Sequence, residues 1–301
     1  MPPFIWGRMS LMVKNIIRRF DSYKRQKKMA KFFIVADVHS FYIQLIKALE
    51  KAGFNKENED HIFVSCGDLL DRGPDPIACL EFVNSLPQER KILIRGNHEE
   101  LFEQCASRKF FQDHDYHNGT VETIKKLANI PSYPQELSDY EIIKKAIDNP
   151  LWKEYIESCV DYYEDDEHIF VHGWIPFNIN KEDKYSYSYN PEWRQEKDWH
   201  NAIWVNGMAC WQDGVIENNK TIYCGHFHAS WGHHYLHDDG PEWDDYVSLL
   251  FGAGNAKFTP FEDAGICCLD ACTAYSDFIN CKVIEKIKKP IRENYHRVLE
   301  E

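Results

Sequence analysis

From Lys31 onward the chain alternates short apolar runs with longer amphipathic stretches, and each apolar run ends in a polar cluster. The runs are FFIVAD, HIFVSCGD and KILIRGN, and the stretches that follow them are YIQLIKALEKAG, PIACLEFVNSL and EELFEQCASRKF. Apolar runs of this length fit buried strands, and amphipathic stretches fit helices that cover a sheet. The alternation therefore predicts β-α repeats and a layered α/β fold.

The later part of the chain predicts a second sheet and a helical insertion. Strand-like runs return at residues 168–174, 221–226, 264–271 and 280–287. Residues from about 100 to 165 have helical spacing and are interrupted by prolines, which indicates helices inserted between the two sets of strands. In layered folds of this kind, ligands bind where the carboxyl ends of the strands open at the edge of a sheet.

We expect a single domain over residues 31–290. Residues 1–30 are a basic extension, for which a partner-binding or membrane-surface helix is the alternative to a solvated segment, and residues 291–301 are a tail. Because the first strand-like run begins near Met29, residues 1–28 are not required by the core, and translation from Met29 is a further hypothesis.

Composition limits the partners and the compartment. The formal charge of −13 over 301 residues makes duplex nucleic acid an unfavourable partner. Ten cysteines without a CxxC pair fit reduced thiols in a cytoplasm. No apolar stretch reaches the roughly 20 residues that cross a bilayer, so we expect a cytoplasmic protein without a membrane span.

The candidate metal ligands all follow strand-like runs. They are Asp37, His39, Asp68, Asn97, His172, His226 and His228. In an extended DVH segment, alternate side chains point the same way, so Asp37 and His39 are expected to share an ion. A set of Asp, Asn and His without thiolate suits two divalent first-row metals. We favour manganese, with iron or zinc as alternatives, and the imidazoles argue against calcium.

Taken in order, the segments DVH, GDLLDRG, RGNHE, VHG and GHFH resemble the motif series of the calcineurin-like metallophosphoesterase superfamily. GDLLDRG and RGNHE resemble its phosphoprotein phosphatase branch, which includes bacterial and phage enzymes. The resemblance covers residues 31–287. It implies a four-layer α/β/β/α sandwich, in which two mixed β-sheets are flanked by helices, and a metal-dependent serine/threonine protein phosphatase.

The resemblance also implies a role for each metal-ligand candidate. Asp37 and His39 would hold the first metal, and Asp68 would bridge the two. The second metal would be held by Asn97, His172 and His226. The second histidine of GHFH, His228, matches phosphodiesterases of the wider superfamily, in which it completes the first metal; a structural role is the alternative.

For catalysis, the resemblance implies in-line attack by a metal-bridging hydroxide. His98 would act as general acid on the leaving group, and Asp71 would orient it. Arg72 would bind two phosphate oxygens, with Arg95 in a related role. Another phosphate-binding arginine expected between the last two histidine motifs is missing, since Arg194 is the only arginine there and does not align.

Several alternatives stay open. The substrate is a phosphorylated protein or peptide, a diadenosine polyphosphate or another small phosphate ester. The GHFH motif favours phosphodiester cleavage as a third activity, and a catalytically dead phospho-binding scaffold is the non-enzymatic reading. The histidine-rich segment at 233–237 is expected to lie in an exposed loop, and the CCLDAC segment at 267–272 to be buried filler in a strand.

Overall fold

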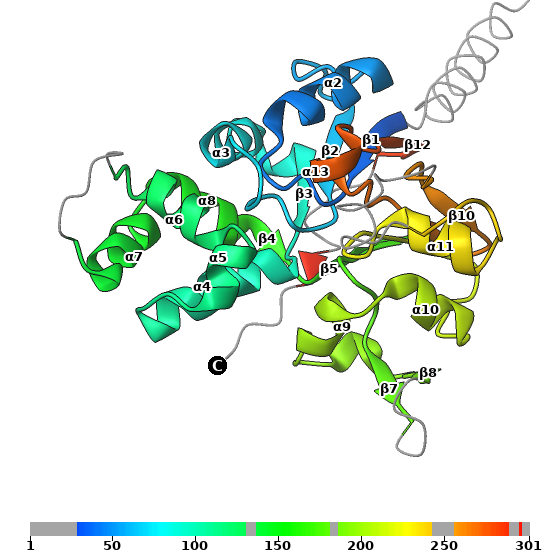
Figure 1. Ribbon diagram of the computed structural model, residues 1–301. Coiled ribbons are helices and arrows are strands. Elements are labelled where there is room, and N and C mark those ends of the chain that lie inside the picture. Colours follow the sequence, from blue (N-terminus) through cyan, green and yellow to red (C-terminus); the bar gives the residue numbers. More distant parts are fainter. Residues whose placement is uncertain (1–28, 131–136, 181–185, 243–255, 289–294, 297–301) are drawn as a thin grey trace, which may run out of the picture.

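The computed structural model describes residues 29–130, 137–180, 186–242, 256–288 and 295–296 (Figure 1). The expected extension at residues 1–28 lies outside this part of the chain, as does most of the expected tail at 291–301. In the described residues, the strands form two large sheets and a small hairpin of β7 (Phe177–Ile179) and β8 (Tyr187–Tyr189).

The first sheet has five strands in the order β12-β1-β2-β3-β4. These are β1 (Met29–Val35), β2 (His61–Ser65), β3 (Lys91–Ile94), β4 (Cys159–Val160) and β12 (Lys282–Ile287). Strand β12 is antiparallel to β1 and the other neighbours are parallel, so the sheet is mixed. The parallel strands bring the loops after β1, β2 and β3 to one edge.

The second sheet has six strands in the order β10-β11-β9-β6-β5-β13. These are β5 (Tyr162–Glu164), β6 (His168–Phe170), β9 (Thr221–Cys224), β10 (Phe261–Asp263), β11 (Ile266–Cys268) and β13 (Tyr295–His296). Its three central strands β11, β9 and β6 are parallel, and the outer pairs are antiparallel. The predicted second mixed sheet is therefore confirmed.

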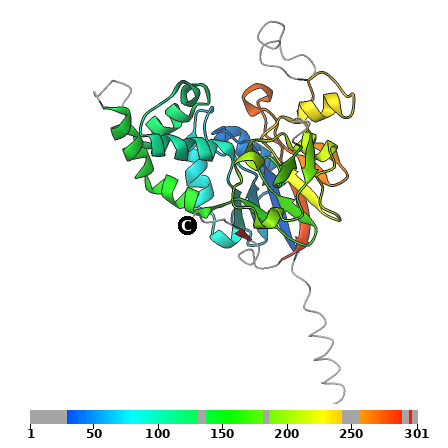
Figure 2. The same cartoon turned by 90° about the horizontal axis from the view of Figure 1, so that it is seen from below.

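Helices cover the outer faces of both sheets. On the first sheet lie α2 (Tyr42–Ala52), α3 (Pro76–Asn84), α4 (Asn97–Arg108), α6 (Thr120–Leu127), α7 (Asp139–Ile147) and α8 (Pro150–Ser158). On the second lie α9 (His200–Trp204), α10 (Gly207–Gln212) and α11 (Ala229–Tyr235). Figures 1 and 2 show α4–α8 on one side of the strands and α10 and α11 on the other. The order of layers is α/β/β/α, as the motif resemblance implied.

The alternation of side chains along β1 shows how the layers are held together. Phe33 and Val35 pack in the cluster beneath the helices, whereas Phe32 and Ile34 pack between the sheets, where Phe170 of β6 also lies. Both faces of the strand are therefore buried, which explains why its sequence is a continuous apolar run without polar alternation.

The helices between β3 and β4 occupy the segment predicted as a helical insertion. They are α4, α6, α7 and α8, with the short α5 (Asp113–His117) between α4 and α6. The last residues of the predicted segment are instead strands β4 and β5, which contribute one strand to each sheet. The short helix α13 (Thr273–Ser276) follows β11.

One expected loop is largely helical. Residues 233–235 of the segment predicted as an exposed loop belong to α11, and His233 is buried with its Nε2 donating to the Thr259 carbonyl at 3.0 Å. Gly232 permits this packing, since a Cβ there would collide with Phe261 and Met208. The sequence missed the helix because its aromatic and histidine residues obscure any apolar periodicity.

Two further predictions concern cysteines and membranes. All ten cysteines are free thiols, and eight of them are buried. Cys267 and Cys268 lie buried in strand β11, as expected of packing residues. Among the described residues, no helix combines the length and the apolar character that a membrane crossing needs.

The packing of Phe63 gives a stability test of the first sheet. Phe63 is fully buried on β2 and its ring lies 5.3 Å from that of Phe82 on α3. We expect Phe63→Ala to lower the free energy of unfolding by about 3–5 kcal/mol, because the cavity cannot collapse completely. Urea denaturation measures this, with Phe110→Ala as the matched control, since Phe110 is 49% exposed and should cost less than about 1 kcal/mol. Equal losses in both variants would contradict the layered core.

Candidate metal centre

The sequence-predicted ligands converge from loops of both sheets. Asp37 and His39 follow β1, Asp68 follows β2, and Asn97 follows β3. His172 follows β6 and His226 follows β9 in the other sheet. All these strands are parallel within their sheets, so each loop leaves a carboxyl end, and residues nearly 190 positions apart come into contact, as in the bond from His226 N to Asp37.

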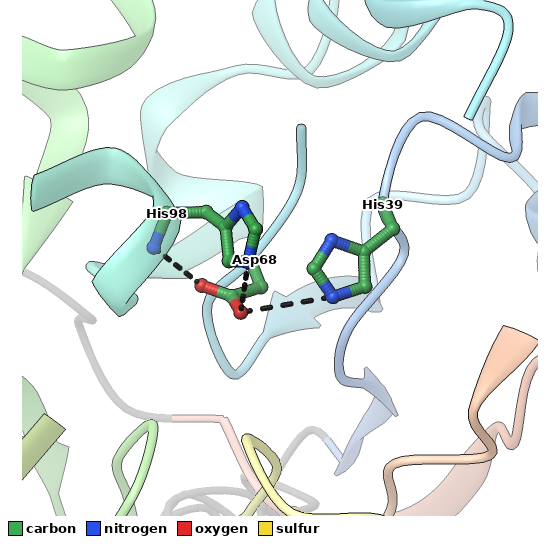
Figure 3. Close-up of side chains that lie close together, drawn as sticks. All are labelled: His39, Asp68 and His98. Atoms are coloured by element: carbon green, nitrogen blue, oxygen red, sulfur yellow. Dashed lines mark hydrogen bonds and ion pairs between the residues drawn. The ribbon is translucent and has the colours of Figure 1, made fainter. Parts of the chain in front are cut away.

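The carboxylate of Asp68 lies at the centre of the site. Its Oδ2 is 3.7 Å from His39 Nε2 and 3.9 Å from His98 Nε2, and Figure 3 shows both imidazoles directed at this oxygen. The two rings are neighbours, with centroids 4.6 Å apart. Its Oδ1 accepts the backbone N–H of His98 at 3.0 Å and lies 3.3 Å from His172 Nε2. The residue is 2% exposed, so these contacts are shielded from water.

Asp68 belongs to two clusters of potential metal ligands. One consists of His39, Asp68 and His98, and the other of Asp68, His172 and His226, with ligand atoms within 4.8 Å of one another in each. Asn97 joins the second, since its Oδ1 is 2.8 Å from His172 Nε2 and 2.9 Å from His226 Nδ1. A carboxylate shared by two clusters has the arrangement required of a bridging ligand.

Three histidines are held so that one ring nitrogen faces the clusters. His39 Nδ1 lies 3.0 Å from the Leu70 carbonyl, and His172 Nδ1 lies 2.8 Å from the Cys66 carbonyl. His226 uses the other ring nitrogen for this contact: its Nε2 lies 2.9 Å from the Trp204 carbonyl. A carbonyl accepts only from an N–H, so these bonds place a proton on the outer nitrogen of each ring and direct the other nitrogen inward.

The backbone around Asp37 and His39 differs from the extended DVH segment that the sequence predicted. Strand β1 ends at Val35, and Asp37 and His39 have φ values of 51° and 48°. The side chains nevertheless approach, with His39 Nε2 at 4.0 Å from Asp37 Oδ1. The prediction of an extended segment was therefore wrong, because Asp37 and His39 meet through a left-handed turn and not through the alternation of side chains along a strand.

Left-handed backbone is frequent among the candidate site residues. Those with positive φ are Asp37, His39, Asp68, Asp71, Arg72 and His226. Each such residue costs of order 1–3 kcal/mol when it is not glycine, so the surrounding contacts must hold the conformation. Glycines allow the loops to close up: a Cβ at Gly96 would collide with the Asp68 carboxylate, and one at Gly225 with that of Asp37.

The charges within the site are strongly coupled. Burial raises the pKa of Asp68, but His172 and His98 outweigh it and hold the pKa well below its usual range. Burial lowers the pKa of His172, but the Asp68 carboxylate outweighs it and raises that pKa to about 10. Burial and His172 lower the pKa of His226 to about 3. Asp68 thus attracts positive charge to the inward nitrogen of His172, beside the His226 imidazole, whose pKa is lowered.

The donor set fits divalent cations. It contains two carboxylates, one amide oxygen and several imidazoles, all buried or half-buried, and burial together with Asp270 raises the pKa of Asp37 well above its usual range. Carboxylates crowded in this way are stabilised by a nearby cation, which favours their charged form. Ligands of this kind, without thiolate, suit manganese, iron or zinc.

His98 differs from the other histidines in its partner. Its Nδ1 lies 2.8 Å from Asp71 Oδ2, a carboxylate and not a carbonyl. That contact fixes the orientation of the ring, which the positioning role predicted for Asp71 requires. Arg72 follows Asp71 and donates from Nη1 to His39 Nε2 at 3.2 Å, so its guanidinium lies at the edge of the first cluster.

Three residues from the sequence analysis have their recorded contacts elsewhere. Arg95 Nη2 pairs with Glu103. Arg194 pairs with Glu164 and Glu217 and stacks on Trp193, so its charge is already matched by two carboxylates. His228 Nδ1 lies 2.7 Å from Ser230 Oγ, and His228 is absent from both ligand clusters of the described residues. The proposed roles of Arg95 and His228 remain predictions.

Glu99 holds the site together, and the sequence analysis gave it no role. Its carboxylate accepts the backbone N–H groups of Asp68, Leu69 and Gly96 at 2.8–3.1 Å, and also the hydroxyl of Tyr155 at 2.8 Å. It therefore joins the loop after β2 to the loop after β3. The RGNHE motif predicted roles for Asn97 and His98 only. The sequence gives no signal for Glu99, because the partners of a buried carboxylate depend on the tertiary structure.

Asp270 is a second buried carboxylate that the sequence analysis left unassigned. It follows β11 within the CCLDAC segment and accepts the backbone N–H of Cys272 at 2.7 Å. Burial raises its pKa, and the charges of His228 and Arg72 oppose that shift. Its position after a third parallel strand of the second sheet was a usable signal, because the other ligand loops occupy equivalent positions.

The fold and the site define a class of protein: an α/β/β/α sandwich that gathers Asp, Asn and His at the carboxyl ends of its strands. The sequence profile of the calcineurin-like phosphoesterase family matches residues 30–240. The chain belongs to this family, which confirms the resemblance seen in its motifs.

Two sequence relatives and one solved structure are similar to the chain. The chain is 33% identical to serine/threonine-protein phosphatase 1 of Salmonella typhimurium over 88 residues, which are 29% of this chain and 38% of that protein. It is 43% identical to the symmetrical bis(5'-nucleosyl)-tetraphosphatase of Psychromonas ingrahamii over 67 residues, 22% of this chain and 23% of that one. The chain thus spans less than half the length of these relatives. A cold-active protein-tyrosine phosphatase of a Shewanella species is similar with a TM-score of 0.44 and 13% identity, covering 85% of this chain and 75% of that chain.

His228 can be tested as a ligand by metal content. We expect His228→Ala to lose one of two bound metals selectively, because the second histidine of GHFH is predicted to complete the first site. Inductively coupled plasma mass spectrometry of the purified protein measures the stoichiometry. The control is His237→Ala, whose ring instead contacts Asp263 at the surface. If the His228 variant retains both metals, His228 is not a metal ligand and its contact with Ser230 is structural.

Proposed function

We propose that the chain is a metal-dependent phosphomonoesterase that acts on phosphorylated serine or threonine in proteins. The observation that carries the proposal is the buried Asp68 carboxylate, shared by two ligand clusters and adjacent to the His98–Asp71 pair. A site with two clusters of potential metal ligands and a histidine held by a second carboxylate suits hydrolysis of a phosphate ester better than a structural metal site.

The cations have assigned ligands. Asp37, His39 and Asp68 would hold one, with His228 as a further candidate. Asp68, Asn97, His172 and His226 would hold the other, and manganese is favoured over iron and zinc. When bound, two such ions lower the pKa of a water so that it attacks phosphorus in line, and they neutralise phosphate oxygens.

The residues of the chain position the substrate and move the proton. The Arg72 guanidinium, at the edge of the first cluster, offers two N–H groups to phosphate oxygens. His98 Nε2 faces the centre of the site, while Nδ1 is held by Asp71. The proton on Nε2 passes to the leaving oxygen, which otherwise would depart as an unstable alkoxide.

The substrate class has two candidates. Similarity to the Salmonella serine/threonine phosphatase supports phosphoproteins, whereas similarity to the Psychromonas tetraphosphatase supports a dinucleoside polyphosphate. We favour the first because GDLLDRG and RGNHE resemble the phosphoprotein phosphatase branch. The ten free cysteines support a reducing compartment such as the cytoplasm.

A substrate panel tests the proposed function. Metal-stripped protein receives manganese, iron or zinc separately and is assayed with phosphopeptides, nucleotides, dinucleoside polyphosphates and a phosphodiester. We expect the highest turnover on phosphoserine and phosphothreonine peptides with manganese. Asp68→Asn serves as the control, since it keeps the shape and removes the bridging charge, and turnover that persists in it would come from a contaminant.

The outcomes of the panel are distinct. Turnover of a dinucleoside tetraphosphate without turnover of phosphopeptides would identify a dinucleoside polyphosphate as the substrate class. Turnover of the diester alone would assign phosphodiesterase activity. The absence of turnover with every ion and ester would overturn the proposal and leave the phospho-binding scaffold.

The role of His98 gives a second test. We expect His98→Ala to lower turnover of an alkyl phosphate by roughly two orders of magnitude or more, because the leaving group loses its proton donor. Metal content, measured by mass spectrometry, should stay at the wild-type value. Undiminished turnover of an ester with a poor leaving group would show that His98 is not the general acid.

A further inference from the structure

The turn between α5 and α6, in the helical insertion, packs against the loop that carries Asp71 and Arg72. Gly119 in this turn has φ 80°, and a Cβ there would collide with the backbone nitrogen of Arg72. Asp71 and Arg72 have φ values of 71° and 61°. Two left-handed turns therefore pack backbone against backbone, and only glycine fits on the side of the insertion.

The residue after Gly119 reaches the acid pair directly. Thr120 begins α6, and its Oγ1 donates to Asp71 Oδ2 at 2.7 Å. The same oxygen lies 2.8 Å from His98 Nδ1. Thr120, Asp71 and His98 are 0%, 1% and 2% exposed, so bulk water does not compete for this oxygen. Hydrogen bonds to a buried carboxylate are among the stronger ones in proteins.

We propose that Thr120 is a positioning residue for general acid catalysis: its hydroxyl fixes the Asp71 carboxylate, and Asp71 in turn fixes the ring of His98. This inference rests on the proposed function. A carboxylate with a single donor partner can rotate about its side-chain bonds, whereas a second donor from a rigid helix restricts it to one orientation. His98 Nε2 then stays directed at the site, 3.9 Å from Asp68 Oδ2.

The helix that carries Thr120 is itself well held. Val121 and Ile124 of α6 are fully buried, and α6 packs against α3, α4 and α7. His98 lies on α4, so the acid and the residue that orients it are both placed by helices of this group. The insertion thereby acts on the reaction without contributing a predicted metal ligand other than Asn97 at its first residue.

Leaving-group dependence separates this role from a structural one. A misplaced general acid slows esters whose leaving oxygen needs a proton, and leaves activated esters nearly unaffected. We expect Thr120→Val, which keeps the shape and removes the hydroxyl, to lower kcat for glycerol 2-phosphate roughly tenfold or more. For p-nitrophenyl phosphate kcat should change by less than about twofold. KM should be unchanged for both esters, and Thr120→Ser should restore most of the loss.

A double-mutant cycle tests the path through His98. In a His98→Asn background, Thr120→Val should cause no further loss on glycerol 2-phosphate, because both changes act on one proton transfer. Thr123→Val is the matched control, since it removes a buried hydroxyl one turn along the same helix. Metal content and the urea midpoint of each variant identify any that lose the site or the fold.

The outcomes distinguish this inference from the proposed function. If His98→Asn leaves glycerol 2-phosphate turnover intact, the assigned general acid is wrong and the inference falls with it. If His98→Asn is slow on that ester but Thr120→Val lowers kcat for both esters equally, or for neither, the inference alone is overturned. Additive losses in the double variant would also overturn it, since Thr120 would then act on another group.

Discussion

The carboxylate of Asp68 is the point on which the site depends. Its negative charge is buried, and a buried charge is tolerated only when it is paired and hydrogen-bonded. Here three imidazoles surround it and a backbone N–H from His98 satisfies one oxygen. Because these groups come from loops of both sheets, the arrangement exists only when the two sheets are stacked with their loops at a common edge. The site is therefore a product of the sandwich.

Buried carboxylates outside the two ligand clusters hold that arrangement. Glu99 joins the loops after β2 and β3 by accepting three backbone N–H groups, and Asp71 joins the acid to the insertion through Thr120. These contacts offset the cost of left-handed backbone at six candidate site residues. Strain of this kind is expected where function and not stability sets the conformation.

Much of the scaffold was readable from the sequence. The runs FFIVAD, HIFVSCGD and KILIRGN correspond to β1, β2 and β3, because strands buried on both faces must be continuously apolar. Polar residues directly after such runs fall at the strand ends, so the sequence also predicted where candidate ligands lie. The helix at 229–235 was not, since its histidines and aromatics hide the apolar spacing. The roles of Glu99, Asp270 and Thr120 were not readable either, because they arise from contacts between distant segments.

The sequence by itself determined which side chains are available and at which strand ends they lie, since the apolar pattern sets the strands and the chemistry of Asp, Asn and His sets the kind of ion. Only the tertiary structure decided how these groups face one another. It directs Asp68 into both clusters, orients His39, His172 and His226 through backbone carbonyls, and matches Arg194 with two glutamates away from the site. The reason is that side-chain direction depends on left-handed turns and on packing between sheets, which no local pattern of residues encodes.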